Sequence, residues 1–433
     1  MIASCIFFSH INISYAEEES TYSIIEDISS FISEDDYIDF IRSSLFEQPE
    51  FKYAVSLTAE QEFNLKYAQR GRFPSISSNV VNDESIERNI KDNQSVRKRR
   101  DDSFDATIEI KQPLYTGGQI NAAIREAKSK AKNTLKQKQN TVSQLILDAN
   151  RIYIDSITSN YLYNYSEKLL KTLRTIKERV NDRVNAGIMD PVESALFSVR
   201  YNRIETLVFQ LKSTAEKDNN NFIFFYKKSY DNLAFPEFKI KSEVISKNKK
   251  SYDVESAQLS YEEKKEQIAS VRSKYLPQFG ISARYTKYDI DDDSNEDDIR
   301  GGLYLNVPLF NFGRGIAQIN SAKAAAEGSK NAIVIAEKDD NIQESSLLSD
   351  FNNAINNRYI FAGAYKTTVL QRKTIEDRLE LSGFAANALS EVILNEIAQL
   401  QTLLENEAFI LTNYFSLLHQ NQQLNNSFRV TFN

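Results

Sequence analysis

The sequence is poor in the residues from which most catalytic and metal sites are built. Its 433 residues include two His, one Cys, two Met and no Trp. Zinc sites and Cys/His nucleophile pairs need His and Cys, so the composition argues against both kinds of site. The lone cysteine, Cys5, lies in a segment that we expect to be removed, which leaves no disulfide framework. We therefore expect no enzyme activity, no metal and no cofactor.

Glycine, proline and long hydrophobic runs are scarce as well. Twelve Gly and seven Pro predict few loops and long regular elements. No segment approaches the run of about 18–20 apolar residues that a membrane-spanning helix requires. The net charge of −7 argues against a general nucleic-acid binder, and the sequence has no glycine-rich phosphate loop.

The first sixteen residues, MIASCIFFSHINISYA, resemble a secretory signal without its basic head. A short apolar region precedes Ser14-Tyr15-Ala16, a small-x-small pattern typical of a cleavage site, and an acidic stretch follows. We predict a signal peptide over 1–16 and a loosely packed acidic leader over 17–36. Two alternatives stay open: a retained N-terminal tail, and a lipobox in which Cys5 carries a lipid.

Two copies of one unit make up the rest of the chain. The matching positions are Pro113 and Pro308, Gly118 and Gly313, Ala127 and Ala322, each 195 residues apart, and Glu193 and Glu391, 198 residues apart. We predict a first repeat over 37–234 and a second over 235–433. Each repeat is expected to contain a helix, a strand, a long loop, a strand, a very long helix, a tight turn and a long helix.

Strict alternation of apolar and polar residues predicts four strands per chain. We place them at about 73–81, 104–112, 278–288 and 301–308. Period two gives each strand one apolar and one polar face. In a soluble protein the apolar face would cover a core, but the rest of this chain offers no compact core for it.

Uninterrupted helical periodicity predicts unusually long helices. Their expected bounds are about 118–186, 191–229, 251–275, 314–383 and 388–424. The first of these would be about 100 Å long. Apolar steps of four and three residues predict side-by-side packing as in coiled coils. The predicted seam comprises Leu145, Ala149, Ile152, Leu169, Leu173, Ile176, Val180, Val192, Leu196, Val199, Ile397, Leu400, Leu404, Ala408, Leu411, Phe415 and Leu418.

Proline and glycine mark the places where the chain changes element. The strand-to-helix joints are Pro113, Gly117, Gly118, Pro308 and Gly313. Because proline lacks an N–H and fits the first turn of a helix, we expect each strand to end and each helix to begin at its proline. The turns of the helical hairpins contain Gly187, Asp190, Pro191, Gly383 and Ala385, with Gly187 as a C-terminal stop and Pro191 at the next helix start.

Four strands with an apolar face cannot close a barrel alone, because an open sheet has two exposed edges. Strands of about nine residues suit the hydrophobic band of an outer-membrane barrel. Three copies would supply twelve strands around an open lumen. We therefore expect a mainly α protein with membrane β structure. Its duplicated coiled-coil hairpins and four strands would trimerise into a twelve-stranded β-barrel and a periplasmic α-helical barrel.

These features resemble the TolC family of outer-membrane efflux and export channels, over about residues 37–415. The motifs are QRGRFPSI and VRSKYLPQF before the strands, QPLYTGG and VPLFNFG before the long helices, and NAGIMDPVESAL at the first helical turn. The resemblance implies a homotrimer in outer-membrane lipid, a periplasmic adaptor protein and an inner-membrane transporter, either ABC or proton-driven. It implies a passive exit duct of a tripartite efflux pump or a type I secretion system, opened at its periplasmic helical tip.

The resemblance also implies where the gate lies. The family's first-turn aspartate falls on Glu193, its ring aspartate on Glu391, its second ring position on Leu394, its gate-locking arginine on Asn387 and its second-turn glycine on Ala385. Asn395 or Glu396 would replace the missing ring acid if the register shifts. A ring of carboxylates in a narrow pore raises their pKa values and attracts cations. Alternatively, Glu193 and Glu391 are ordinary first-turn acids that complement helix N-termini. The five residues of the hairpin turns are the candidate adaptor-docking positions.

Two outer loops and one rival function complete the predictions. The loop at 82–103 contains the basic run 97–100, and the acidic loop at 289–298 lacks the glycine and terminal glutamate of an EF-hand, so we expect a solvated loop there. The rival to a channel is a soluble periplasmic coiled-coil adaptor or scaffold, which has no need of four amphipathic strands. The cargo stays open among drugs, small toxins and polypeptides.

Overall fold

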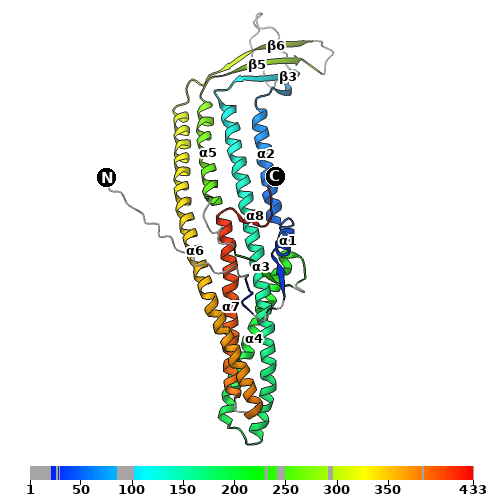
Figure 1. Cartoon of the computed structure of the whole chain (residues 1–433). Helices are drawn as coiled ribbons and strands as arrows, with labels where there is room; N and C mark the ends of the chain where they lie inside the picture. Colours follow the sequence, from blue (N-terminus) through cyan, green and yellow to red (C-terminus); the bar gives the residue numbers. More distant parts are fainter. Residues whose placement is uncertain are drawn as a thin grey trace, which may run out of the picture. The chain divides into compact units, whose positions relative to one another are not determined.

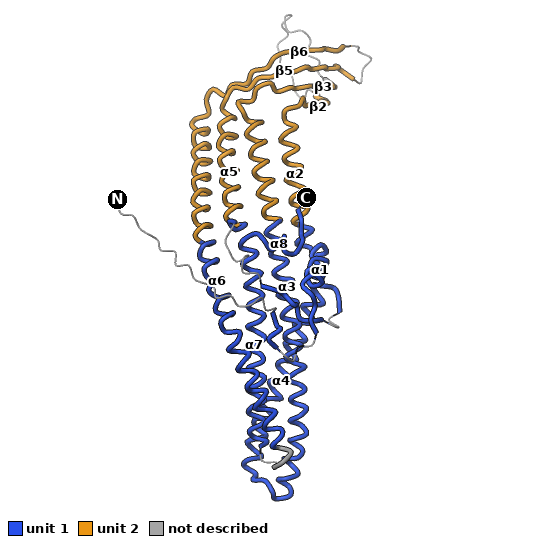
Figure 2. Tube along the Cα trace, viewed as in Figure 1, with its two compact units in different colours: residues 1–53, 139–252, 339–433 blue, residues 54–138, 253–338 orange. Residues whose placement is uncertain are grey.

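The computed structural model describes residues 21–25, 28, 30–84, 102–229, 233–240, 249–290, 296–382 and 385–432. The predicted signal peptide with Cys5, the basic run 97–100, the centre of the acidic loop and Gly383 lie outside these residues. Two compact units are present (Figure 2). Unit 1 comprises Met1–Tyr53, Gln139–Tyr252 and Asp339–Asn433, and unit 2 comprises Ala54–Lys138 and Asp253–Lys338. Each unit draws on both predicted repeats, so the compact units differ from the repeats of the sequence.

The helices are as long as their uninterrupted periodicity predicts. The two longest are α3, Gln119–Asn185, with 67 residues, and α6, Arg314–Ser382, with 69 residues. The remaining helices are α1 (Glu34–Leu45), α2 (Pro49–Arg70), α4 (Pro191–Tyr226), α5 (Tyr252–Ser273), α7 (Ala386–Gln420) and α8 (Leu424–Ser427). Within the described parts of the chain, no helix combines the length and the apolar character needed to cross a membrane.

Unit 2 contains a four-stranded antiparallel sheet in the order β2-β3-β5-β6 (Figure 1). Its strands are β2 (Ser75–Glu84), β3 (Asp102–Tyr115), β5 (Gln278–Lys287) and β6 (Asp297–Asn306). The central pairing of β3 with β5 joins the two predicted repeats. In the described residues β2 and β6 each pair on one side only, so both are sheet edges.

The sheet has the two contrasting faces that the alternation predicts. Cross-strand partners share a face, and Ile76, Ile110 and Ala283 are aligned in this way across β2, β3 and β5. This apolar face is open to the surroundings: Ile76 is 71%, Ile299 78% and Leu303 79% exposed. The other face is polar. There Glu109 pairs with Lys111 at 2.7 Å and Arg284 at 3.0 Å, and the hydroxyls of Thr107 and Thr286 are 3.1 Å apart.

The prolines of the strand-to-helix joints do not stand where the sequence predicted. Pro113 lies within β3, opposite Gly280, where the pairing with β5 becomes irregular before Tyr115, and α3 begins only at Gln119. Pro308 follows the end of β6 at Asn306, whereas α6 begins at Arg314. The expectation that these prolines occupy the first helical turn is therefore wrong. A proline is tolerated in a strand at such an irregularity, where no ladder hydrogen bond is lost.

Glycines make the change of direction instead. Gly117, Gly118 and Gly313 have φ angles of 61°, 85° and 82°, in the left-handed region that side chains other than glycine rarely adopt. At Gly117 an added Cβ would lie 2.7 Å from the Cβ of Leu276, so the close approach of the chain also requires glycine. Gly118 and Gly313 face open space.

Unit 1 is held together by one hydrophobic core centred on α7. Along α7 the predicted seam is confirmed, since Ile397, Leu400, Leu411 and Phe415 have no exposed surface. Most of the predicted α3 seam is also buried, including Leu173 and Val180. Together with α4 and α6, these helices surround α7 with apolar side chains.

The predicted seam at the start of α4 is wrong. Val192, Leu196 and Val199 are 65%, 52% and 68% exposed. The buried face of α4 consists instead of Phe197, Tyr201, Ile204, Val208, Leu211, Ala215, Phe222 and Tyr226. This stripe is displaced by one residue, which is about 100° around a helix, and it brings the larger aromatic side chains into the core.

The described part of the acidic leader is packed rather than loose. Tyr22 and Ile25 are buried, and Tyr22 contacts Phe235 with ring centroids 4.8 Å apart. Strand β1 (Phe31–Ser33) pairs in parallel with β4 (Phe235–Glu237), and Ser33 then caps α1 by accepting a hydrogen bond from the N–H of Asp36. Acidic composition therefore misled the prediction, because the apolar residues of this segment join the core of unit 1.

Candidate functional site: the helical turns of unit 1

The first helical turn, between α3 and α4, is fixed by its own backbone and caps. Gly187 has a φ of 70° and donates to the carbonyl of Val184, while Ile188 donates to the carbonyl of Arg183. These two bonds form the Schellman arrangement that ends a helix at glycine. Asp190 then caps α4, its carboxylate accepting from the N–H of Val192 at 2.8 Å, and Pro191 is the first helical residue.

The second turn, between α6 and α7, lacks such a side-chain cap. Helix α6 ends at Ser382, and α7 begins at Ala386. The N-cap residue is Ala385, which makes no side-chain hydrogen bond to the helix. The backbone alone continues here, with the N–H of Leu389 donating to the carbonyl of Ala385 at 2.8 Å.

An arginine of α4 joins α4 to α7 close to these turns. Arg200 Nη2 lies 3.2 Å from Oε2 of Glu391, and its Nη1 donates to the carbonyl and the side-chain Oδ1 of Asn387 at 3.3 and 3.4 Å. The amide of Asn387 in turn donates to the carbonyl of Glu193 at 3.1 Å. Three predicted gate candidates, Glu193, Asn387 and Glu391, thus form one cluster with Arg200, which we name the tip cluster.

The tip cluster decides between the readings of its two glutamates as helix-capping acids. Glu193 lies in the first turn of α4, as the capping reading predicts, and only its backbone carbonyl takes part in the cluster. Glu391 is outside the first turn of α7, because α7 begins at Ala386, earlier than predicted. The capping reading is therefore wrong for Glu391, whose carboxylate is 60% exposed and engaged by Arg200.

The other gate candidates lie farther along α7. Leu394 is partly buried against the core and Asn395 is exposed. Glu396, offered as a substitute ring acid, has no exposed surface and is bonded to Arg372 at 2.8 Å and to the hydroxyl of Tyr165. Glu396 therefore does not present its carboxylate to solvent, and that expectation is wrong.

Sequence reasoning missed Arg200. The residue stands seven positions after Glu193, which places both on one face of α4. The family's arginine position is occupied by Asn387, so the positive charge comes from the opposite hairpin. A search for a basic residue at this helical spacing would have found it.

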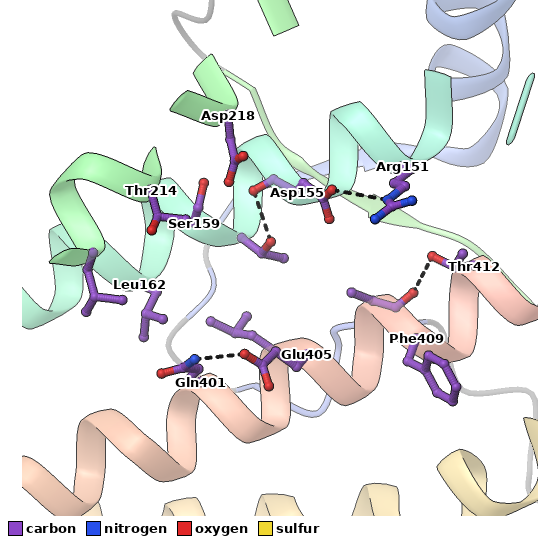
Figure 3. Close-up of a pocket in the computed structure, with 14 residues that line it drawn as sticks. Arg151, Asp155, Ser159, Leu162, Thr214, Asp218, Gln401, Glu405, Phe409 and Thr412 are labelled. Atoms are coloured by element: carbon purple, nitrogen blue, oxygen red, sulfur yellow. Dashed lines mark hydrogen bonds and ion pairs between the residues drawn. The ribbon is translucent and has the colours of Figure 1, made fainter. Parts of the chain in front are cut away.

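A groove runs between α3, α4 and α7 (Figure 3). Its volume is about 560 Å³, and its walls combine apolar Leu162 and Phe409 with Asp155, Asp218 and Glu405. Burial raises the pKa of both aspartates above the ordinary value, and Arg151 lies 3.6 Å from Asp155.

A second groove, of about 710 Å³, shares one lining residue, Gln401, with the first. Leu394 and Asn395 of α7 line it opposite Asn202 and Arg203 of α4. The two grooves are therefore adjacent along the line where α4 meets α7. The lining is suited to contact with another surface, and it brings together no nucleophile, base and oxyanion donor of the kind that catalysis needs.

Comparison with known proteins bears on the whole arrangement. Residues 247–338 match the family model described as outer membrane efflux protein. No curated protein matches the chain. The chain is similar to the CmeC outer membrane channel of Campylobacter jejuni, with 12% identity, a TM-score of 0.73, and coverage of 95% of this chain and 90% of that one.

Two further solved structures share the fold. The open state of the MtrE outer membrane channel of Neisseria gonorrhoeae is 15% identical, with a TM-score of 0.64 and coverage of 89% of each chain. The outer membrane protein VceC of Vibrio cholerae is 14% identical, with a TM-score of 0.62 and coverage of 91% of this chain and 96% of that one. The predicted fold is confirmed by these structures, and the predicted resemblance is confirmed by the family model in the second repeat.

Proposed function

We infer that this chain is an outer membrane efflux channel of the TolC family, the exit duct of a tripartite efflux pump. The inference rests on the family match, on a fold shared with solved channels, and above all on one feature of unit 2. That feature is a sheet with an exposed apolar face and two unpaired edges. A soluble adaptor or scaffold would have to bury this face, so the sheet argues against the rival function.

The open sheet edges support a homotrimer. Three copies can pair β6 of one with β2 of the next, which gives twelve strands and leaves no edge. The apolar face then meets outer-membrane lipid, and the polar face with Glu109 and Arg284 lines the lumen. The helices occupy the periplasm in this assignment.

The tip cluster supports a gate at the helical turns. Arg200 ties the hairpin of the first repeat to that of the second through Asn387 and Glu391. Because both charged side chains are partly exposed, the ion pair is weak, worth about 1 kcal/mol at most, and a docking partner can exchange it for its own contacts. Leu394 and Asn395 lie beside this latch and belong to the same proposed gate region.

The hairpin turns and the neighbouring grooves are the proposed docking surface for a periplasmic adaptor. The exposed apolar side chains Val192, Leu196 and Val199 follow the capped turn at Gly187, Asp190 and Pro191. On the other hairpin, Ala385 is the described turn residue of this surface, and Gly383 remains a sequence-based candidate. An inner-membrane transporter, ABC or proton-driven, would supply the energy through the adaptor.

The test is conductance of the purified full chain in planar lipid bilayers after extraction from the outer membrane. We expect stable pores from a trimer. Leu303→Lys places a charge on the apolar sheet face and should prevent membrane insertion. Tyr304→Lys, on the polar face beside it, is the matched control and should insert normally. A water-soluble monomer that forms no pore would refute the proposed function.

A further inference from the structure

Glu396 is a charged group with no exposed surface at a junction of three helices of unit 1. Its Oε2 is 2.8 Å from Nε of Arg372 on α6, and its Oε1 accepts a hydrogen bond from the hydroxyl of Tyr165 on α3. Glu396 itself belongs to α7. One buried carboxylate therefore connects the long helix of the first predicted repeat with both helices of the second hairpin.

The two bonds of Glu396 differ in what their loss would leave behind. Arg372 also binds Glu376 on its own helix at 2.9 Å, and α6 is the hairpin partner of α7. Breaking the pair between Arg372 and Glu396 would leave a buried carboxylate without its counter-charge, which is strongly unfavourable. Breaking the bond from Tyr165 leaves that ion pair intact and frees only a neutral hydroxyl. Movement of α7 away from α3 therefore releases Tyr165 first.

The position of Tyr165 relates this bond to the tip cluster. Glu396 follows Glu391 by five residues on α7, and Arg200 holds Glu391 from α4. Both contacts thus tie α7 to a helix of the first repeat, one through an exposed pair and one through a buried bond. We propose that the Tyr165 hydroxyl is a second latch of the gate, which holds α7 against α3 and keeps the helical tip closed after the Arg200 contact is lost.

This inference rests on the proposed channel function and names a positioning residue for it. Tyr165 remains a donor at every physiological pH, because burial and the bond to Glu396 raise its pKa far above the ordinary value. Its ring also packs edge-on against Tyr365 of α6, with centroids 6.3 Å apart. Tyr165→Phe keeps that ring packing and removes only the hydroxyl, so the variant isolates the proposed latch.

The test compares single-channel recordings of the purified full-length trimer for Tyr165→Phe, Arg200→Ala and the double variant. The matched control is Tyr153→Phe on the same helix, whose buried hydroxyl donates to the carbonyl of Ala234 at 2.8 Å and has no bond to α7. We expect Arg200→Ala alone to raise the open probability by about fivefold at most. Adding Tyr165→Phe should raise it at least about tenfold further, the effect of one to two hydrogen bonds.

The outcomes separate the latch from ordinary structural support. Tyr165→Phe and Tyr153→Phe should lower the melting temperature by similar amounts, but only Tyr165→Phe should raise the open probability. Equal open probabilities for these two variants, with functioning pores, would overturn the latch and leave the channel function standing. If neither the wild type nor any variant forms pores, the channel function fails and the latch fails with it.

Discussion

The buried ion pair between Arg358 and Glu407 should be the most sensitive charged site of unit 1. Glu407 has no exposed surface, and the Arg358 side chain is only 6% exposed. One carboxylate oxygen lies 2.8 Å from Nε of Arg358, and the other accepts from the backbone N–H of Tyr22 at 2.8 Å. The pair therefore joins α6, α7 and the N-terminal segment in a site from which water is excluded.

Arg358→Met removes the counter-charge and leaves the carboxylate buried. Loss of one partner of a buried ion pair costs about 3–5 kcal/mol. Replacing both partners, as in Arg358→Met with Glu407→Gln, should restore most of that stability, because glutamine can still accept from the N–H of Tyr22 and no charge is left unpaired. For a chain of this size, we expect the single variant to lower the melting temperature by about 5 °C or more.

The assay is thermal unfolding of the purified full chain in detergent, followed by the helical circular dichroism signal at fixed protein concentration. The matched control is Arg151→Met, which removes an arginine from an exposed pair with Asp155 at 3.6 Å. That change should shift the melting temperature by no more than about 1 °C. If Arg358→Met is no more harmful than Arg151→Met, or if the double variant is as unstable as the single one, the reasoning from buried charge is refuted.

Three further predictions follow from other parts of the chain. Asp218→Asn should raise the melting temperature at pH 7 by no more than about 2 °C, with the difference vanishing near pH 4: burial raises the pKa of Asp218 above 3.8, so this site is most stable when protonated and loses stability as pH rises. A difference that persists at pH 4 would contradict this sign. Gly117→Ala should destabilise unit 2 by about 2 kcal/mol or more, because its Cβ would meet Leu276, whereas Gly118→Ala tests the left-handed backbone strain alone; equal losses in chemical denaturation would show that the contact does not matter. Glu391→Gln should weaken both the closure of the pore and its cation selectivity in bilayer recordings, and an unchanged selectivity would remove Glu391 from the lumen.

Much of the fold could be predicted because its elements are long and strictly periodic. The helices predicted at about 118–186 and 314–383 are observed as α3, Gln119–Asn185, and α6, Arg314–Ser382. The alternation in β3 and β5 correctly predicted the two-faced sheet. Periodicity alone could not choose between two adjacent apolar stripes on α4, where Phe197 and Tyr201 are buried and Val192 and Leu196 are exposed. That choice depends on the volume available beside α7.

The candidate site was only partly predictable, because its contacts join residues far apart in the sequence. Asn387 and Glu391 were found through the resemblance, but their partner Arg200 belongs to the other repeat. Glu396 was assigned to a pore ring from its position in the sequence, whereas the structure buries it between Arg372 and Tyr165. The sign and spacing of charges along one helix do not reveal which charge is neutralised by another helix.

The two helical turns also show how a duplicated sequence can yield a single latch. Glu193 and Glu391 correspond in the two repeats, yet Asp190 and Pro191 start α4 two residues before Glu193, while the uncapped α7 starts at Ala386. Glu193 therefore stays in the first turn beside the helix N-terminus, where its charge is favourable. Glu391 is carried one turn farther along its helix, beyond that influence, where its carboxylate can pair with Arg200. A difference in capping thus converts two equivalent glutamates into a helix-stabilising residue and a contact between hairpins.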